Sequence, residues 1–150
     1  MDFLKEFAFL APYVTALGVA VAVWQIIINN IQQRTSFEDS LTKEYREITR
    51  RIPYKALIGE ELCEKDQVLA YNEIYNYMDL CNEQIFLRMS GRVRNKTWNN
   101  WQEGMLTNFS LKVFDRASQE VFSKLSHNFK ELKRVQDSGY KTDPKQWKNV

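Results

Sequence analysis

The sequence contains few of the residues from which catalytic and metal sites are commonly built. Its 150 residues include one histidine, His127, and two cysteines, Cys63 and Cys81, whose spacing matches no metal or redox motif. There is also no glycine-rich phosphate loop, no HExxH and no CxxC. We therefore expect a protein that is not an enzyme and that holds no metal or cofactor. Both cysteines are expected to be buried thiols in a reducing compartment.

Glycine and proline are scarce as well, with five and three residues. Because no run of alternating β-branched residues is present either, the sequence predicts an all-α fold. The formal net charge is only +2. A protein that coats DNA needs a large excess of cations, so we expect no DNA partner.

What the sequence does contain is a long uncharged segment, from Phe7 to Ile28. At about 1.5 Å per residue, a helix of this length crosses a hydrocarbon core of about 30 Å. The flanking segments, MDFLKE and IIINNIQQRT, lack the basic start and the small-residue exit of a cleavable signal peptide. We therefore predict that residues 1–35 form a retained transmembrane anchor whose span is 7–28.

The charges on either side of the span predict its orientation. One lysine and two acids precede it, whereas the residues that follow include Arg34, Lys43, Arg46, Arg50, Arg51 and Lys55. The positive-inside rule then places the C-terminal part in the cytoplasm. We expect a single-pass protein of the bacterial inner membrane.

Small and polar residues recur along the span in alternating steps of four and three. They are Ala11, Thr15, Gly18, Ala22, Gln25 and Asn29, which we call the seam. Small residues let membrane helices approach closely, and amide side chains can form hydrogen bonds across the interface. The seam predicts self-association of the helix, although a simple anchor rich in alanine produces the same pattern by chance.

After the span, apolar residues recur at helical spacing. This predicts a cytoplasmic domain over residues 36–136 with about four helices, at about 36–52, 65–89, 98–108 and 111–136. Residues 137–150 contain Gly139, Pro144 and several charges, and are expected to be a mobile tail.

One stretch of this domain, NEQIFLRMSGRVRNKTWNNW from Asn82 to Trp101, contains no acid between Glu83 and Glu103. Its candidate ligand-binding residues are Arg88, Arg92, Arg94, Asn95, Lys96 and Trp98. Arginine forks match phosphate oxygens, asparagine amides can pair with an adenine edge, and an aromatic face can stack on a base. The stretch therefore suits a nucleotide.

Two other interpretations of this region stay open. Trp98, Trp101 and Met105 have helical spacing, which is also typical of a core, and the cations can simply face water or anionic lipid. Asp79 and Glu83 share a helix face, where they can bind a divalent metal or, as we favour, pair with nearby arginines because no third ligand is present.

In layout, the uncharged span and this basic stretch resemble the small membrane effectors of type III CRISPR systems that respond to cyclic tetra-adenylate. That resemblance implies a membrane helix, a short all-helical cytoplasmic domain, a homotetramer, and a cyclic oligonucleotide as ligand. Bacterial proteins of unassigned function with one membrane helix and an NEQ-FLR-GR-TW-W pattern are a second resemblance.

Three functions follow as hypotheses. The first is a ligand-gated effector of antiviral defence that binds a cyclic oligoadenylate and perturbs or permeabilises the lipid bilayer. The second is a constitutive membrane-tethered scaffold that recruits a protein partner. The third, which we favour least, is a membrane-bound ring nuclease or phosphodiesterase.

Overall fold

The chain was analysed as a computed structural model that describes the backbone of residues 3–147 and the side chains of residues 12–147. Six α-helices and one short 3-10 helix make up this part of the chain. They are α1 (Phe3–Arg51), α2 (Tyr54–Leu57), α3 (Glu64–Met89), α4 (Asn95–Phe109), α5 (Lys112–Leu125), α6 (Lys130–Asp137) and η1 (Pro144–Gln146). No strand occurs among residues 3–147, so the predicted all-α class is confirmed.

The chain divides into two compact units, Met1–Phe37 and Glu38–Val150, and the division falls within α1. We call the second unit the helical domain.

In the first unit, the described part of α1 exposes its apolar side chains. Leu17 is 67% exposed and Trp24 62% exposed, and the apolar window that begins at Pro12 has no buried part. This helix is long and apolar enough to cross a membrane. Pro12 lies inside α1, because the helix already begins at Phe3. Membrane helices tolerate such a proline when neighbouring groups satisfy the freed carbonyl.

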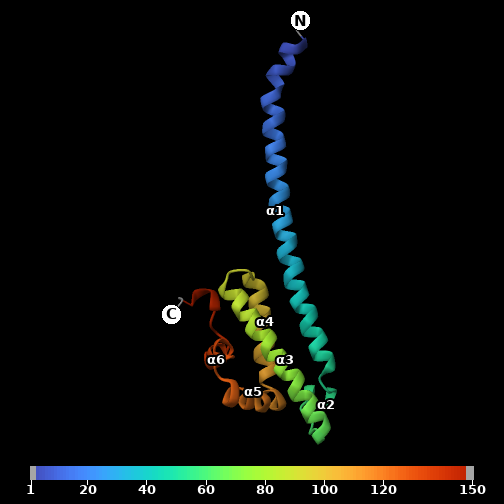
Figure 1. Ribbon diagram of the computed structural model, residues 1–150, viewed down its shortest axis with the longest axis vertical. Helices are drawn as coiled ribbons and strands as arrows, with labels where there is room; N and C mark the ends of the chain where they lie inside the picture. Colours follow the sequence, from blue (N-terminus) through green and yellow to red (C-terminus); the bar gives the residue numbers. More distant parts are fainter. Residues whose placement is uncertain (1–2, 148–150) are drawn as a thin grey trace. The chain divides into compact units, whose positions relative to one another are not determined.

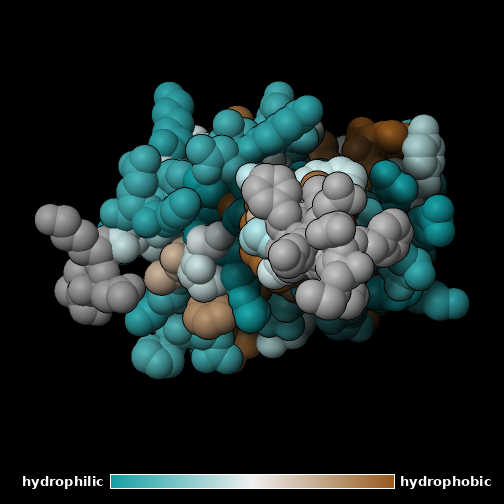
Figure 2. Space-filling model, turned by 90° about the horizontal axis from the view of Figure 1, so that it is seen from above, coloured by the Kyte–Doolittle hydropathy of each residue, from teal (hydrophilic) through white to brown (hydrophobic). Residues whose placement is uncertain are grey.

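The helical domain is organised around α3, which contacts α5, α6 and η1, while α4 contacts α5 (Figure 1). Side chains from most of the domain's helices form the core. They include Leu41, Ile48, Ile52, Ile74, Met78, Ile85, Trp98, Met105, Phe114, Phe129, Leu132 and Val135. Away from this core, hydrophilic side chains cover most of the surface that is visible in Figure 2.

An aromatic cluster joins distant segments at the centre of the domain. The ring of Tyr77 lies 5.5 Å from that of Phe109 and 5.8 Å from that of Phe114, between ring centroids. Phe109 in turn stacks on Tyr140 at 6.2 Å. Such pairs stabilise a core by about 0.5–1.5 kcal/mol each beyond the burial of apolar area, and this cluster ties α3, α4, α5 and the C-terminal residues together.

The predicted helix over 111–136 is broken in the structure. α5 ends at Leu125 and α6 begins at Lys130, with a polar turn between them. Phe129 is 1% exposed and its ring packs edge-on against Tyr75 at 5.7 Å. Phe129, Leu132 and Val135 are all buried, and α6 contacts α3.

The segment for which a mobile tail is predicted makes contacts with the helical domain as far as residue 147. Gly139 and Tyr140 both have positive φ, 63° and 58°, in the left-handed region, where a short turn reverses the chain after α6. Pro144 is then buried, and Trp147 lies over the guanidinium of Arg134 at 4.2 Å. We call Ser138–Trp147 the C-terminal strap.

Candidate functional site

Arg88, in the last turn of α3, is only 2% exposed. Its Nε donates a hydrogen bond to Asp143 Oδ1 at 2.7 Å, and its Nη2 donates to Asp143 Oδ2. Nη1 donates to the carbonyl of Val93 at 2.8 Å, and Nη2 also donates to Asn95 Oδ1 at 2.7 Å. A buried guanidinium must be paired, and these contacts pair it on every side.

Arg94 is the N-cap of α4 and binds a carboxylate from α1. Its backbone N–H donates to Glu38 Oε1 at 2.8 Å, and its Nε donates to Oε2 at 2.8 Å. Nη2 of Arg94 and Oγ1 of Thr97 also donate to Oε2, at 2.5 and 2.7 Å. Glu38 is 3% exposed, so an anion does lie at the N-terminus of α4, and it is a side chain of the same domain.

The electrostatics of both carboxylates follow from these contacts. Burial opposes the charge of Glu38, but the hydrogen bonds from Arg94 and Thr97 outweigh it and hold the pKa of Glu38 below its usual value. The hydrogen bond from Arg88 likewise lowers the pKa of Asp143. Both groups are therefore ionised at neutral pH and compensate the cations that they contact.

The six predicted ligand residues consequently have different environments. Arg88, Arg94 and Asn95 engage groups of the domain itself, and Trp98 is a core residue at 1% exposure. Arg92 and Lys96 are exposed, and Arg92 has interactions of its own.

The two residues that sequence reasoning missed here are Glu38 and Asp143. Each lies more than 50 positions away in the chain from the arginine that it contacts. The available signal was the absence of acids around the four cations, because buried or half-buried arginines need carboxylates and the nearest had to come from remote segments.

Of the seam, the side chain of Ala11 lies outside the described residues. Thr15, Gly18, Ala22, Gln25 and Asn29 are all exposed. A Cβ placed on Gly18 meets nothing within 4 Å, so the helix has room there for a side chain or for a close neighbour.

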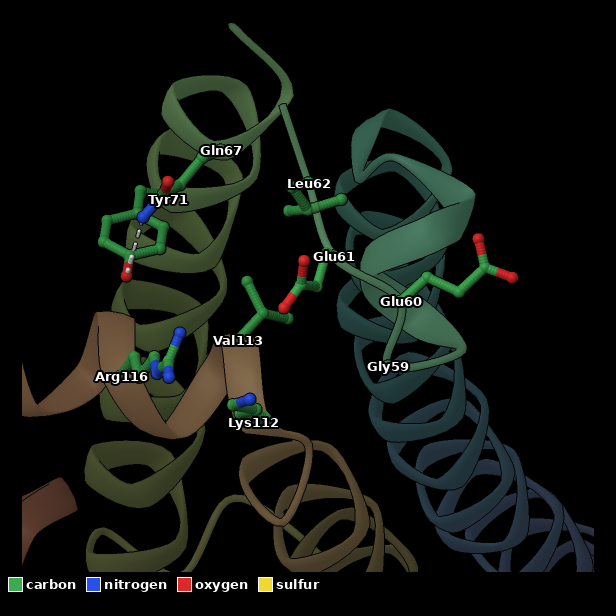
Figure 3. A pocket seen from close by; sticks show the side chains of 9 residues that line it. All are labelled: Gly59, Glu60, Glu61, Leu62, Gln67, Tyr71, Lys112, Val113 and Arg116. Carbon is green, nitrogen blue, oxygen red and sulfur yellow. Dashed lines mark hydrogen bonds between the residues drawn. The ribbon is translucent and has the colours of Figure 1, made fainter. Parts of the chain in front are cut away.

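A cavity of about 200 Å³ lies between the loop that follows α2 and helices α3 and α5 (Figure 3). Glu61, Lys112 and Arg116 give it both charge signs, and Gln67 donates to the hydroxyl of Tyr71 at 3.5 Å on one wall. Its charged walls are exposed, and none of the buried polar atoms that lack a partner borders it. We therefore assign it no ligand.

Within the described residues, no group of three or more histidine, cysteine or acidic side chains has the geometry to hold a metal ion. The two cysteines are free thiols, but the expectation that both are buried is wrong for Cys63, which is exposed just before α3. Cys81 is buried, and the loss of solvent raises the pKa of its thiol to about 12, which leaves it protonated and unreactive.

No protein family matches the sequence, and neither the curated proteins nor the solved structures contain a significant match to the chain.

Proposed function

We propose that this chain is a non-enzymatic, membrane-anchored scaffold whose helical domain binds a protein partner at the membrane surface. The proposal is carried by two observations: the first unit has an exposed apolar helix, and the helical domain has a closed core of its own. A helix that exposes bulky apolar residues such as Leu17 and Trp24 is stable in hydrocarbon and aggregates in water.

The basic flank supports an orientation with the helical domain in the cytoplasm. Arg34, Lys43 and Arg46 follow the apolar helix closely, and such a cluster resists translocation across a bacterial inner membrane. A domain with an exposed free thiol at Cys63 is also suited to a reducing compartment.

The internal contacts of the basic stretch favour the scaffold over the nucleotide sensor. A phosphate that approaches Arg88 or Arg94 has to displace Asp143 or Glu38, and each of these carboxylates is tethered to the chain at high effective concentration. Arg88 and Arg94 therefore stabilise the fold through their ion pairs with Asp143 and Glu38.

The second candidate is the membrane effector that binds a cyclic oligoadenylate as a homotetramer. One observation supports it, which is that Arg94 and Thr97 form a built anion cradle at the N-terminus of α4. In this version a phosphate of cyclic tetra-adenylate takes the place of Glu38 and so changes how α1 is held. Such a ligand shifts the equilibrium between the Glu38-bound and Glu38-displaced states only if it binds the displaced state more tightly.

Two measurements on the full-length chain separate these functions. Alkaline carbonate washing of membranes from an expressing bacterium tests anchoring, and the chain is expected in the pellet. Thermal melting in detergent with added cyclic tetra-adenylate tests sensing, because a ligand that binds only the folded state at a hundredfold excess over Kd stabilises it by about 2.7 kcal/mol.

The scaffold requires no change in Tm on adding the nucleotide. A Tm increase that Arg94→Gln abolishes and the matched surface variant Arg116→Gln retains establishes the effector instead. Release of the chain from the membrane by carbonate overturns both functions.

A further inference from the structure

Two open cavities of about 350 and 460 Å³ adjoin along α3, because Asp79 and Glu83 line both of them. The first lies between α3 and the part of α1 that belongs to the helical domain, and the second extends toward α6. We call the combined groove the acidic trough. Its carboxylates are those of Glu44, Glu47, Asp79, Glu83 and Glu131, and its apolar residues include Phe86 and Met89.

The acids of the trough are poorly compensated. Among the described residues, Glu47 forms an ion pair with the 79% exposed Lys43 at 3.9 Å, and Glu131 with its neighbour Lys130 at 3.5 Å. Arg51, a cation that lines the trough, is already held by a different acid, since its Nε donates to Glu73 Oε2 at 2.9 Å.

Three further carboxylates, those of Glu44, Asp79 and Glu83, form no ion pair within the part of the chain that the structure describes. Loss of solvent, together with the charges of Glu44 and Asp79, raises the pKa of Glu83. Like charges four residues apart on one helix destabilise it, so the fold carries a local conflict here. Conflicts of this kind concentrate at functional sites.

Beside these acids lies an apolar anchor point. Phe86 is 65% exposed in the last turn of α3, where its neighbours Ile85 and Leu87 are buried. Asn82, one turn earlier, also lines the trough, and its Oδ1 is a buried acceptor with no donor in the described structure. The trough thus presents carboxylates and an aromatic face, and the donors of its Arg51 and Asn82 side chains already bind groups of the domain.

We infer that the acidic trough is the docking surface for a basic segment of a partner protein that carries one bulky apolar side chain. Lysine or arginine side chains of that segment oppose Glu44, Asp79 and Glu83, and its apolar side chain covers Phe86 and Met89. The inference rests on the proposed scaffold function and supplies its partner class.

The charge of the trough argues against other occupants. Nucleic acid and anionic lipid are repelled by it, and no group of its acids has the geometry of a metal site among the described residues. A basic segment gains charge-assisted hydrogen bonds to carboxylates that have no other partner, and its arrival relieves the repulsion between Asp79 and Glu83.

The test measures fluorescence anisotropy of a short labelled peptide with the full-length chain in a neutral detergent. The probe peptide alternates lysine and glycine around one central phenylalanine, and its counterpart has glutamate at each lysine position. Empty micelles give the background for both peptides. We expect the chain to bind the lysine peptide and not the glutamate peptide, with an affinity that falls as salt is added.

Asp79→Asn combined with Glu83→Gln keeps the volumes and removes two charges. It is expected to weaken lysine-peptide binding by about tenfold for each carboxylate, whereas Phe86→Ser weakens it by about tenfold and leaves the salt dependence unchanged. The matched control, Glu103→Gln with Glu120→Gln, removes two charges from exposed positions of α4 and α5 and is expected to bind as the parent does. Circular dichroism confirms that each variant is folded.

The inference is overturned if the parent binds both peptides equally, or if the trough and control variants bind alike. A third outcome also overturns the inference. If the parent binds no peptide but self-associates, and the trough variant abolishes that self-association, the surface binds a second copy of the chain. Failure of this inference can be told apart from failure of the proposed scaffold function, because carbonate extraction reports on membrane anchoring independently of peptide binding.

Discussion

Arg88 and Asp143 form a two-pronged ion pair across 55 positions of the chain, with Nε donating to Oδ1 at 2.7 Å. The arginine is 2% exposed and the aspartate side chain 25% exposed. This pair attaches the C-terminal strap to the end of α3, and the neighbouring Arg94–Glu38 pair attaches α1 to the start of α4 in the same way. The basic stretch therefore holds two remote segments, α1 and the C-terminal strap, against the helical domain.

The first prediction concerns the strap. Asp143→Asn leaves the buried Arg88 charge without its carboxylate, so we expect the free energy of unfolding to fall by about 3 kcal/mol in urea titrations. Asp137→Asn is the matched control, because Asp137 pairs with Lys133 four residues away on an exposed helix face, and the variant is expected to cost under about 0.5 kcal/mol. Equal losses of unfolding free energy in the two variants would contradict the claim that the Arg88–Asp143 pair holds the C-terminal strap.

The second prediction is a loss of stability in acid. The pKa of Glu38 and that of Asp143 are both lower in the folded chain than the ordinary values of 4.5 and 3.8. The folded state therefore binds these protons less tightly than the unfolded state does. Their stabilisation is fully present above the ordinary values and is lost as pH falls through the lowered ones. Glu38→Gln should remove part of this acid dependence, and an unchanged pH profile for that variant contradicts the account.

The third prediction has the opposite sign. The pKa of Glu83 is raised, so its proton is bound more tightly in the folded chain, and the charged form at neutral pH is destabilising. Glu83→Gln should therefore raise Tm at pH 7, and the gain should disappear below about pH 4.5, where the parent side chain is also neutral. Glu103→Gln is the control with no expected gain. A lower Tm for Glu83→Gln at pH 7 shows that the trough is not crowded with negative charge.

The fourth prediction concerns association of the membrane helix along the seam. Gly18→Leu and Ala22→Leu should reduce cross-linked oligomers of the full chain, because a bulky side chain holds neighbouring helices apart. Leu17→Ile, which leaves the seam untouched, should not. Since a Cβ at Gly18 meets nothing within 4 Å, the variant does not disturb the helix itself. Unchanged cross-linking in both seam variants assigns the pattern to chance.

Local patterns predicted the elements of the helical domain well and their contacts poorly. Apolar spacing predicted a helix over 65–89, close to the observed α3 (Glu64–Met89), because a long buried helix leaves a clear periodic signal. It did not predict the break at Phe129, which depends on how α6 packs against α3.

The basic stretch shows the same limit for the candidate site. Its surplus of cations was visible in the sequence, but a local window contains no information on the carboxylates of Glu38 and Asp143. The sequence allows Trp98 as a stacking residue or as a core residue, and its 1% exposure shows that it lies in the core. Pairing across the fold, rather than residue type, decides whether such cations are free to bind a ligand.

The most direct test of membrane anchoring with a cytoplasmic domain uses the different exposure of the two cysteine thiols. Cys63 is exposed and Cys81 is buried, so a maleimide that cannot cross membranes reports on Cys63 alone in the folded chain, and Cys63→Ser is the blank. In spheroplasts of a bacterium that expresses the full chain, the account predicts no labelling until the membrane is permeabilised, and then labelled chain in the membrane fraction. Labelling of Cys63 in intact spheroplasts, or labelled chain in the soluble fraction, contradicts it.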